Sequence, residues 1–328
     1  MHASTETRTT EPPDLASRLA ALKPLPAPRM PSASLRIRVK TSPRLRRLLP
    51  TRLVFKIAVR RGRARWKRSP GDRENAVAAM ETIVAGTSRA HELTELARAH
   101  LIESVVDQAL FWQPWRNLDL DAQSMAHLHD ALGQGRGVLL SLCHSGQYHR
   151  ASTTGLWSVE RVVYVVVGRS FFEKPTAGYA GRYLARWQTL LRSPLVPADR
   201  SFTVLQALLK RGEIVLLHFD RPGPHETRFL GKTATLAGGT ARLAFATNAL
   251  VLPMRARRVS YRGRLDVGAP LDPEDFAGVD QLHDRLAALH EAWILEYPES
   301  MRDPRSFGWG EWATAESWIR PKSAGRPA

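Results

Sequence analysis

The stretch GVLLSLCHSGQYHR (residues 137–150) decides the fold class of this 328-residue chain, because it joins a buried strand to a polar turn. Residues 138–142 form a short apolar run, which is typical of a strand buried on both faces. The run stops just before His144, a small serine-glycine turn follows, and a second histidine, His149, comes five residues after the first. In α/β proteins, such polar groups at the end of a buried strand mark the edge of the sheet where sites are built.

Beyond this stretch, apolar runs of strand length alternate with helical patterns. Strands are expected at 138–142, 162–167, 214–219 and 250–255, and helices at 72–86, 91–112, 179–191, 202–211, 239–247 and 280–296. The alternation predicts an α/β fold, with a central, mostly parallel sheet flanked by helices and a helical N-terminal region.

Three polar side chains follow three of these strands. His144, Arg169 and Asp220 each lie just past an expected strand end. Because the carboxyl ends of parallel strands meet at one edge of the sheet, we expect one crevice to gather all three.

The composition restricts the class of protein. A hydrophobic fraction of 43% is sufficient for a large core, and the single cysteine, Cys143, excludes an intramolecular disulfide framework. The longest apolar runs are strand-sized, well short of the roughly 20 residues that span a bilayer. Residues 1–21 mix acids, threonine and proline, so they do not resemble a secretory signal. We expect a soluble or peripherally attached protein.

The positive charge is concentrated near the N-terminus. Residues 1–70 hold 18 of the 48 Lys and Arg residues but 3 of the 31 Asp and Glu residues, so they account for most of the net charge of +17. We therefore divide the chain into a disordered tail (1–35), a basic segment for which membrane association is one interpretation (36–70), a single α/β domain (71–315) and a flexible tail (316–328).

The basic segment contains the stretch RLRRLLPTRLVFKIAVRRGRARWKR (residues 44–68), in which apolar and basic side chains alternate irregularly. Basic heads beside apolar bodies suit the surface of an anionic membrane. A solvated basic arm and a nucleic-acid-binding arm are the alternatives. Nucleic acid is the least favoured partner, because no recognisable reading module accompanies the charge.

Several sites could explain the two histidines. A structural histidine is the simplest. A metal site of His144, His149, His218 and Asp220 is an alternative, but the spacing matches no HExxH-type signature, so we expect no metal. Ser145 lacks the first glycine of the G-x-S-x-G nucleophile elbow, which argues against a serine hydrolase.

The order of the motifs resembles the bacterial lipid A secondary acyltransferases and the related phosphatidylinositol mannoside acyltransferases of the lysophospholipid acyltransferase superfamily. The resemblance covers about residues 75–312. It rests on five successive blocks, which are GRGVLLSLCHSGQYH (135–149), VVYVVVGR (162–169), RYLARWQTLLRSPLV (182–196), ALLKRGEIVLLHFDRPG (207–223) and RFLGKTATLAGGTARLAFATNALVLPMRARR (228–258).

This resemblance implies transfer of a fatty acyl group to a hydroxyl of a membrane glycolipid or phosphoglycolipid, at the cytoplasmic side of the membrane. The donor is acyl-CoA or acyl-carrier protein, and no cofactor is required. His144 is the expected general base, and the amides of the turn formed by Ser145, Gly146 and Gln147 are expected oxyanion donors.

Other residues are expected to bind the substrates. Arg169 and Arg186 would hold phosphate or carrier groups. Gly239 and Thr240 begin a helix; they would either contact the donor or acceptor, or simply start that helix.

One position departs from the family pattern. The family carries H-x4-D/E, whereas this chain has His149 in place of the carboxylate. A neutral His149 could accept a hydrogen bond from His144 and fix its tautomer, but it brings no negative charge. Asp220 is the best replacement. Three hypotheses remain: an active enzyme that uses Asp220, an enzyme with altered chemistry, and a degenerate, non-catalytic lipid-binding protein.

Overall fold

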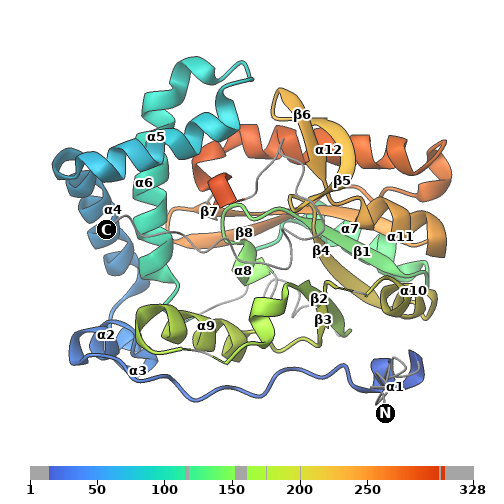
Figure 1. Ribbon diagram of the computed structural model, residues 1–328, viewed down its shortest axis with the longest axis horizontal. Coiled ribbons are helices and arrows are strands. Elements are labelled where there is room, and N and C mark those ends of the chain that lie inside the picture. Colours follow the sequence, from blue (N-terminus) through green and yellow to red (C-terminus); the bar gives the residue numbers. More distant parts are fainter. Residues whose placement is uncertain are drawn as a thin grey trace, which may run out of the picture.

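The computed structural model describes residues 15–114, 118–151, 161–174, 176–199, 201–302 and 304–306. The expected flexible tail, 316–328, and the first 14 residues of the expected disordered tail lie outside these ranges. From residue 15 the structure differs from the expectation of disorder. Helix α1 (Leu15–Ala20) is followed by an extended segment that runs along the domain, and Leu19 and Leu22 pack against the core (Figure 1).

The main sheet has six strands in the order β3-β2-β4-β1-β7-β8, and all neighbours are parallel except β7 and β8. The predicted α/β class, with a central, mostly parallel sheet flanked by helices, is confirmed. The strands are β1 Val138–Leu142, β2 Val163–Val167, β3 Leu195–Pro197, β4 Ile214–His218, β5 Pro222–Phe229, β6 Lys232–Leu236, β7 Leu250–Val259 and β8 Arg262–Val267.

Helices cover both faces of this sheet. The remaining helices are α2 Leu35–Lys40, α3 Pro43–Arg47, α4 Thr51–Arg68, α5 Pro70–Val84, α6 Leu93–Leu110, α7 Ala122–Gly133, α8 Tyr148–Arg150, α9 Gly178–Leu190, α10 Phe202–Lys210, α11 Gly239–Thr247 and α12 Val279–Glu296. Short 3-10 turns occur at Ala90–Glu92, Arg169–Phe172, Pro273–Asp275, Pro298–Ser300 (η5) and Pro304–Ser306.

Strand β1 explains why two layers of helices are needed. All five of its residues are buried, and alternate side chains point to opposite faces of the sheet. Leu139 packs in a cluster with side chains of α10, α11 and α12, whereas Leu140 packs in a second cluster with side chains of α7 and α9. The continuous apolar run of β1 is therefore the signature of a strand covered on both sides.

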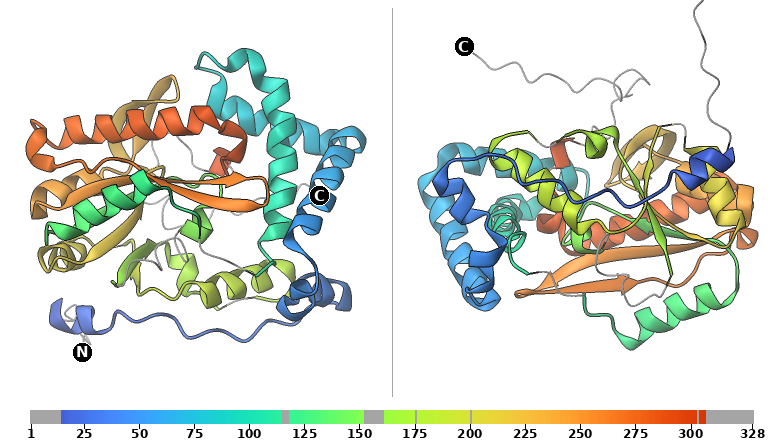
Figure 2. Two further views of the ribbon diagram at one scale, coloured as in Figure 1. Left: turned by 180° about the vertical axis from the view of Figure 1, so that it is seen from behind. Right: turned by 90° about the horizontal axis from the view of Figure 1, so that it is seen from below.

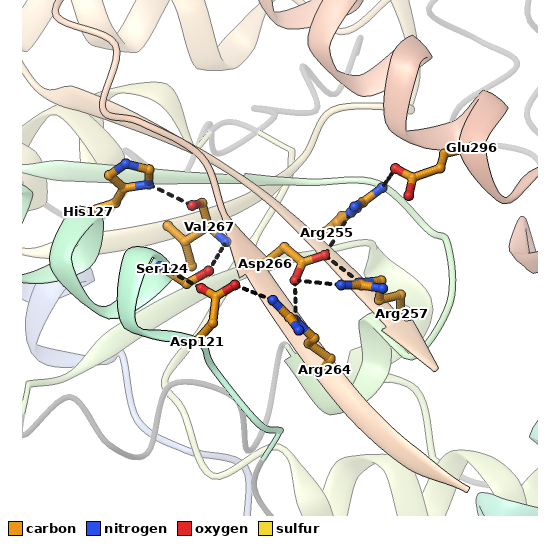
Figure 3. A network of polar contacts seen from close by, with 9 residues as sticks. All are labelled: Asp121, Ser124, His127, Arg255, Arg257, Arg264, Asp266, Val267 and Glu296. Atoms are coloured by element: carbon orange, nitrogen blue, oxygen red, sulfur yellow. Dashed lines mark hydrogen bonds and ion pairs between the residues drawn. The ribbon is translucent and has the colours of Figure 1, made fainter. Parts of the chain in front are cut away.

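The sequence did not predict β8 or the β5–β6 hairpin, because neither is a simple apolar run. Charge pairing helps to hold β8 against β7 instead (Figure 3). Asp266 of β8 accepts hydrogen bonds from Nε of Arg255 (2.9 Å), Arg257 (2.6 Å) and Arg264 (2.7 Å). Burial raises the pKa of Asp266, but the hydrogen bonds from these three arginines lower it by more. The net pKa is below the usual value, so the carboxylate is charged. In the sequence these arginines resemble surface charges. In the structure, Arg255 and Arg257 of β7 join the two strands through Asp266 of β8.

The basic segment is helical and docked on the domain. Helix α4 buries Val54, Ala58 and Gly62, which are four residues apart and share one face, against α6 (Figure 1). A Cβ at Gly62 would lie 2.8 Å from Cα of Ile102, so glycine permits the two helices to approach. No helix in the described part of the chain is both long and apolar enough to span a membrane.

The contact between α4 and α6 can be tested with one core valine. Val106 of α6 is fully buried in the cluster with Val54 and Ala58. We expect Val106→Ala to lower the free energy of unfolding by about 2 kcal/mol, because it removes buried methyl groups and leaves a cavity. The partly buried neighbour Val105 gives the matched control, and Val105→Ala should cost less. Urea unfolding curves measure both; equal losses would contradict this packing.

Candidate active site

His144 and Asp220 meet at the carboxyl edge of the sheet. Strands β1 and β4 are neighbours, and each is followed two residues later by one of these side chains. Nδ1 of His144 lies 2.7 Å from Oδ1 of Asp220, and the backbone N–H of His144 donates to Oδ2 at 2.7 Å. The carboxylate is fully buried, whereas the imidazole is 18% exposed. One carboxylate thus holds both the backbone and the ring of His144.

The charge of Asp220 fixes the tautomer of this ring. Burial raises the pKa of Asp220, but the His144 imidazole and the two hydrogen bonds lower it by more, so the carboxyl group is ionised. A carboxylate can only accept hydrogen bonds, so Nδ1 of His144 carries the proton. Nε2 is therefore the unprotonated ring nitrogen, and so the basic atom of the imidazole.

Two aromatic rings set the orientation of the imidazole. His218 stacks on His144 with ring centroids 4.1 Å apart, and Tyr148 packs edge-to-face at 4.8 Å. Burial, with the neighbouring His144, holds the pKa of His218 well below its usual value. Burial also raises the pKa of Tyr148. Both rings are therefore neutral at pH 7, and neither places a second charge against His144.

The loop after β1 is held by the end of η5 and by the residues that follow it. The N–H of Gly146 donates to the carbonyl of Ser300, and the N–H of Arg302 donates to the carbonyl of His144, both at 2.9 Å. The amides of residues 145–147 were expected to be oxyanion donors. For Gly146 this expectation is wrong, because its N–H is already bound.

Gly146 has a structural reason to be glycine. Its φ of +54° is left-handed, and a Cβ there would lie 1.9 Å from the carbonyl oxygen of Ala256 on β7. Ser145, beside it, is buried. The small-residue turn in the sequence thus lets the loop pass close to β7.

His149 does not take the role that the motif pattern suggested. Its buried ring packs edge-on against Phe111, Tyr148 and Trp187. Burial, followed by the charges of Arg302 and Arg150, holds its pKa well below the usual value, so it is neutral. Since Asp220 binds Nδ1 of His144, the carboxylate and not His149 fixes the tautomer.

The two predicted binding arginines have different fates. Arg169 is 78% exposed and lies 3.9 Å from Asp199, so it remains accessible at the sheet edge. Arg186 is buried and donates to the carbonyls of Phe111 (2.9 Å) and Gln113 (2.8 Å). The expectation that Arg186 holds a phosphate is wrong, because these carbonyls already engage its guanidinium and tie α9 to the end of α6.

Gly239 and Thr240 begin helix α11, as expected. The N–H of Ala237, just before this helix, donates to the carbonyl of Arg221, which places the start of α11 beside the residue after Asp220. Thr240 is buried. A Cβ on Gly239 would touch nothing within 4 Å, so packing does not require glycine there.

Sequence reasoning missed a buried polar cluster next to the site. Arg302 lies over the rings of Tyr183 (5.2 Å) and Tyr148 (6.0 Å). Burial raises the pKa of Asp107 on α6 to about 7, although Arg302 and Arg150 oppose the shift. No sequence signal pointed to Arg302, because it follows the last long helix in a stretch without periodicity.

Comparison with known proteins bears out the resemblance. No family model matches the chain. The phosphatidylinositol mannoside acyltransferases of two strains of Mycobacterium tuberculosis are each 31% identical over 202 residues, which cover 57% of this chain and 62% of the relative. The chain therefore spans less than two thirds of the length of these relatives.

Among solved structures, a 1-acyl-sn-glycerophosphate acyltransferase from Thermotoga maritima aligns with a TM-score of 0.35 and 12% sequence identity. The alignment covers 75% of this chain and 96% of that protein.

The buried histidines predict how stability depends on pH. His290 of α12 pairs with the Ser141 hydroxyl of β1 at 2.8 Å, and burial lowers its pKa from 6.5 to about 4. The His290 imidazole therefore binds a proton more tightly in the unfolded chain than in the folded protein. Its contribution to stability falls as the pH drops below 6.5. We expect His290 to account for a loss of about 1.5 kcal/mol between pH 6.5 and about pH 5. Urea unfolding of His290→Gln should show a correspondingly smaller loss; an unchanged pH slope would contradict the assignment.

Proposed function

We propose that this protein is a peripheral membrane O-acyltransferase. It moves a fatty acyl group from acyl-CoA or acyl-carrier protein to a hydroxyl of a glycolipid or phosphoglycolipid at the cytoplasmic side of the membrane. The buried Asp220–His144 pair, open to solvent only through the imidazole, carries the proposal. The names of the Mycobacterium relatives support acyl transfer and an acceptor of the phosphatidylinositol mannoside type.

In this mechanism, His144 acts as general base. Nε2 takes the proton of the acceptor hydroxyl while the hydroxyl oxygen attacks the thioester carbonyl. The C–O bond forms, the C–S bond breaks, and the proton passes from the imidazolium to the departing sulfur to give the free thiol. Asp220 stabilises the imidazolium that exists between these steps, which is the part that a carboxylate plays in other catalytic pairs.

The remaining polar groups take supporting parts. Because the Gly146 amide binds Ser300, the amides of Ser145 and Gln147 are the oxyanion donors in this proposal. Arg169, exposed at the same sheet edge, is available to bind a phosphate of the donor.

The surface of α2, α3 and α4 supports attachment to a membrane. On α4, Leu53 and Ile57 are exposed on a face different from the one that packs on α6. No acidic residue occurs between residues 15 and 71. Apolar side chains beside uncompensated basic ones fit the headgroup boundary of an anionic bilayer. The exposed large apolar side chains of this region are Leu35, Val39, Leu45, Leu48, Leu49, Leu53 and Ile57.

The catalytic proposal predicts a graded series of variants. Thiol release from acyl-CoA or acyl-carrier protein, with extracted membrane lipids as acceptor, should fall at least about 10³-fold in His144→Ala. Asp220→Asn keeps the side-chain shape but removes the charge, so we expect a loss of about 10²- to 10⁴-fold. His149→Asn is the matched control and should stay within about tenfold of the unmodified protein, because His149 does not orient the base.

A normal rate in His144→Ala would refute this role. Lipid binding by the unmodified protein without thiol release from either donor would instead favour the non-catalytic lipid-binding alternative.

The membrane proposal predicts that exposed apolar residues matter apart from charge. Replacing Leu53 and Ile57 together by serine should weaken binding to vesicles that contain anionic lipid at least tenfold, because two side chains no longer enter the bilayer boundary. Val259→Ser, at the exposed end of β7, is the control and should leave binding unchanged. Cosedimentation measures both. Preferential binding to duplex DNA in competition with the vesicles would overturn the choice of partner.

A further inference from the structure

A groove of about 840 Å³ lies apart from the candidate active site, on the N-terminal side of helix α9. Its walls are the extended segment 30–33, helices α2 and α3, and the side chain of Arg182 from α9. Figure 1 shows α2 and α3 beside α9, and the view from below in Figure 2 shows the extended segment running along the same side of the molecule.

Arg182 is a buried cation with neutral partners. The residue is 8% exposed. Its guanidinium donates to Oγ1 of Thr41 (2.7 Å) and to the carbonyl of Pro31 (3.0 Å). These two hydrogen bonds hold the guanidinium in place. Neither partner carries a charge. Burying a cation without an anion is costly, so the site favours an anionic occupant.

The rest of the groove adds both charge and apolar surface. Arg38, Arg44 and Arg47 line it, and no acidic residue nearby in the sequence offsets them. Leu35 and Val39 line it as well and are 74% and 51% exposed. Guanidinium groups bind phosphate oxygens through charge-assisted hydrogen bonds, and exposed leucine and valine side chains favour hydrocarbon over water. A ligand that satisfies both has a phosphate and an aliphatic chain.

We propose that this groove is a binding site for the phosphate headgroup of one anionic phospholipid, with the lipid chains against Leu35 and Val39. The proposal rests on the membrane attachment proposed above and names the lipid class that the surface recognises. It adds a defined site to a surface that would otherwise attract anionic lipid only through its overall charge.

Helix α9 connects this site with the candidate active site. The N–H of Gly178, at the start of α9, donates to the carbonyl of Ser32 in the groove wall. Arg182 faces the groove, while the next residue, Tyr183, stacks on Phe111 and lies under Arg302. A lipid held in the groove would therefore fix the helix that also packs beside the His144 loop, and so present the active site to the membrane in one orientation.

The test uses a monomeric lipid, so that binding to one site is measured without any bilayer surface. The probe is dihexanoyl phosphatidylglycerol below its critical micelle concentration, with binding measured by titration calorimetry on the full chain. Replacing Arg38 and Arg47 together by glutamine should weaken binding at least tenfold, because two charge-assisted contacts are lost. Replacing Arg36 and Arg52 together by glutamine removes the same amount of charge from α2 and α4, but outside the groove. This control should change binding less than about twofold.

Three results would overturn the proposal. Equal losses in the two double variants would show that diffuse charge binds the lipid. Equally tight binding of dihexanoyl phosphatidylcholine would show that net anionic charge is not recognised. Equally tight binding of inorganic phosphate would show that the apolar wall contributes nothing, and so would remove the assignment to a lipid.

The catalytic and membrane proposals can fail separately from this one. His144→Ala should bind the monomeric lipid as the unmodified protein does, whether or not thiol release is ever observed. The Leu53 and Ile57 double variant should also keep monomer binding while losing vesicle binding. Loss of monomer binding in either variant would overturn the assignment of the site to the groove.

Discussion

The site depends on the contact between the Asp220 carboxylate and two nitrogens of His144, the backbone N and the ring Nδ1. A carboxylate with no exposure to water must be compensated, and here one backbone N–H and one imidazole N–H do so at 2.7 Å each. Because both donors belong to His144, the two hydrogen bonds fix the path of the loop after β1 and also the orientation of the His144 ring. That constraint exists because β1 and β4 are paired in register, with Leu142 opposite His218.

The remainder of the loop is held by parts of the chain that are distant in sequence. Ser300 and Arg302 bind its backbone, Ala256 of β7 leaves room only for glycine at position 146, and the rings of Tyr148 and His218 enclose the imidazole. The imidazole of His144 thus lies between two neutral rings and is oriented by one carboxylate. In the proposed mechanism, a base that is already oriented needs little reorganisation when it takes a proton.

Arginine has several different uses in this protein, and burial separates them. Arg186 is buried and bound to backbone carbonyls, and Arg255 and Arg257 lock a hairpin through Asp266. Arg169 stays exposed at the sheet edge. Those of α2 and α3 have no acidic residue near them in the sequence and border a groove with apolar walls. Exposed or unpaired arginines of this kind are available for anionic ligands.

The sequence by itself determined the α/β class, the four parallel strands from apolar runs, and the placement of His144 and Asp220 at strand ends, since these follow from local periodicity and from the geometry of parallel sheets. Only the tertiary structure decided which polar groups are already occupied. The Gly146 amide and the Arg186 guanidinium looked available in the sequence, but Ser300, Phe111 and Gln113 bind them across the fold. The pairing of β1 with β4 decided that Asp220, far along the chain, lies against His144, whereas His149 does not hold its Nδ1. Hydrogen-bond partners distant in sequence leave no periodic pattern, so they become visible only when the chain is folded.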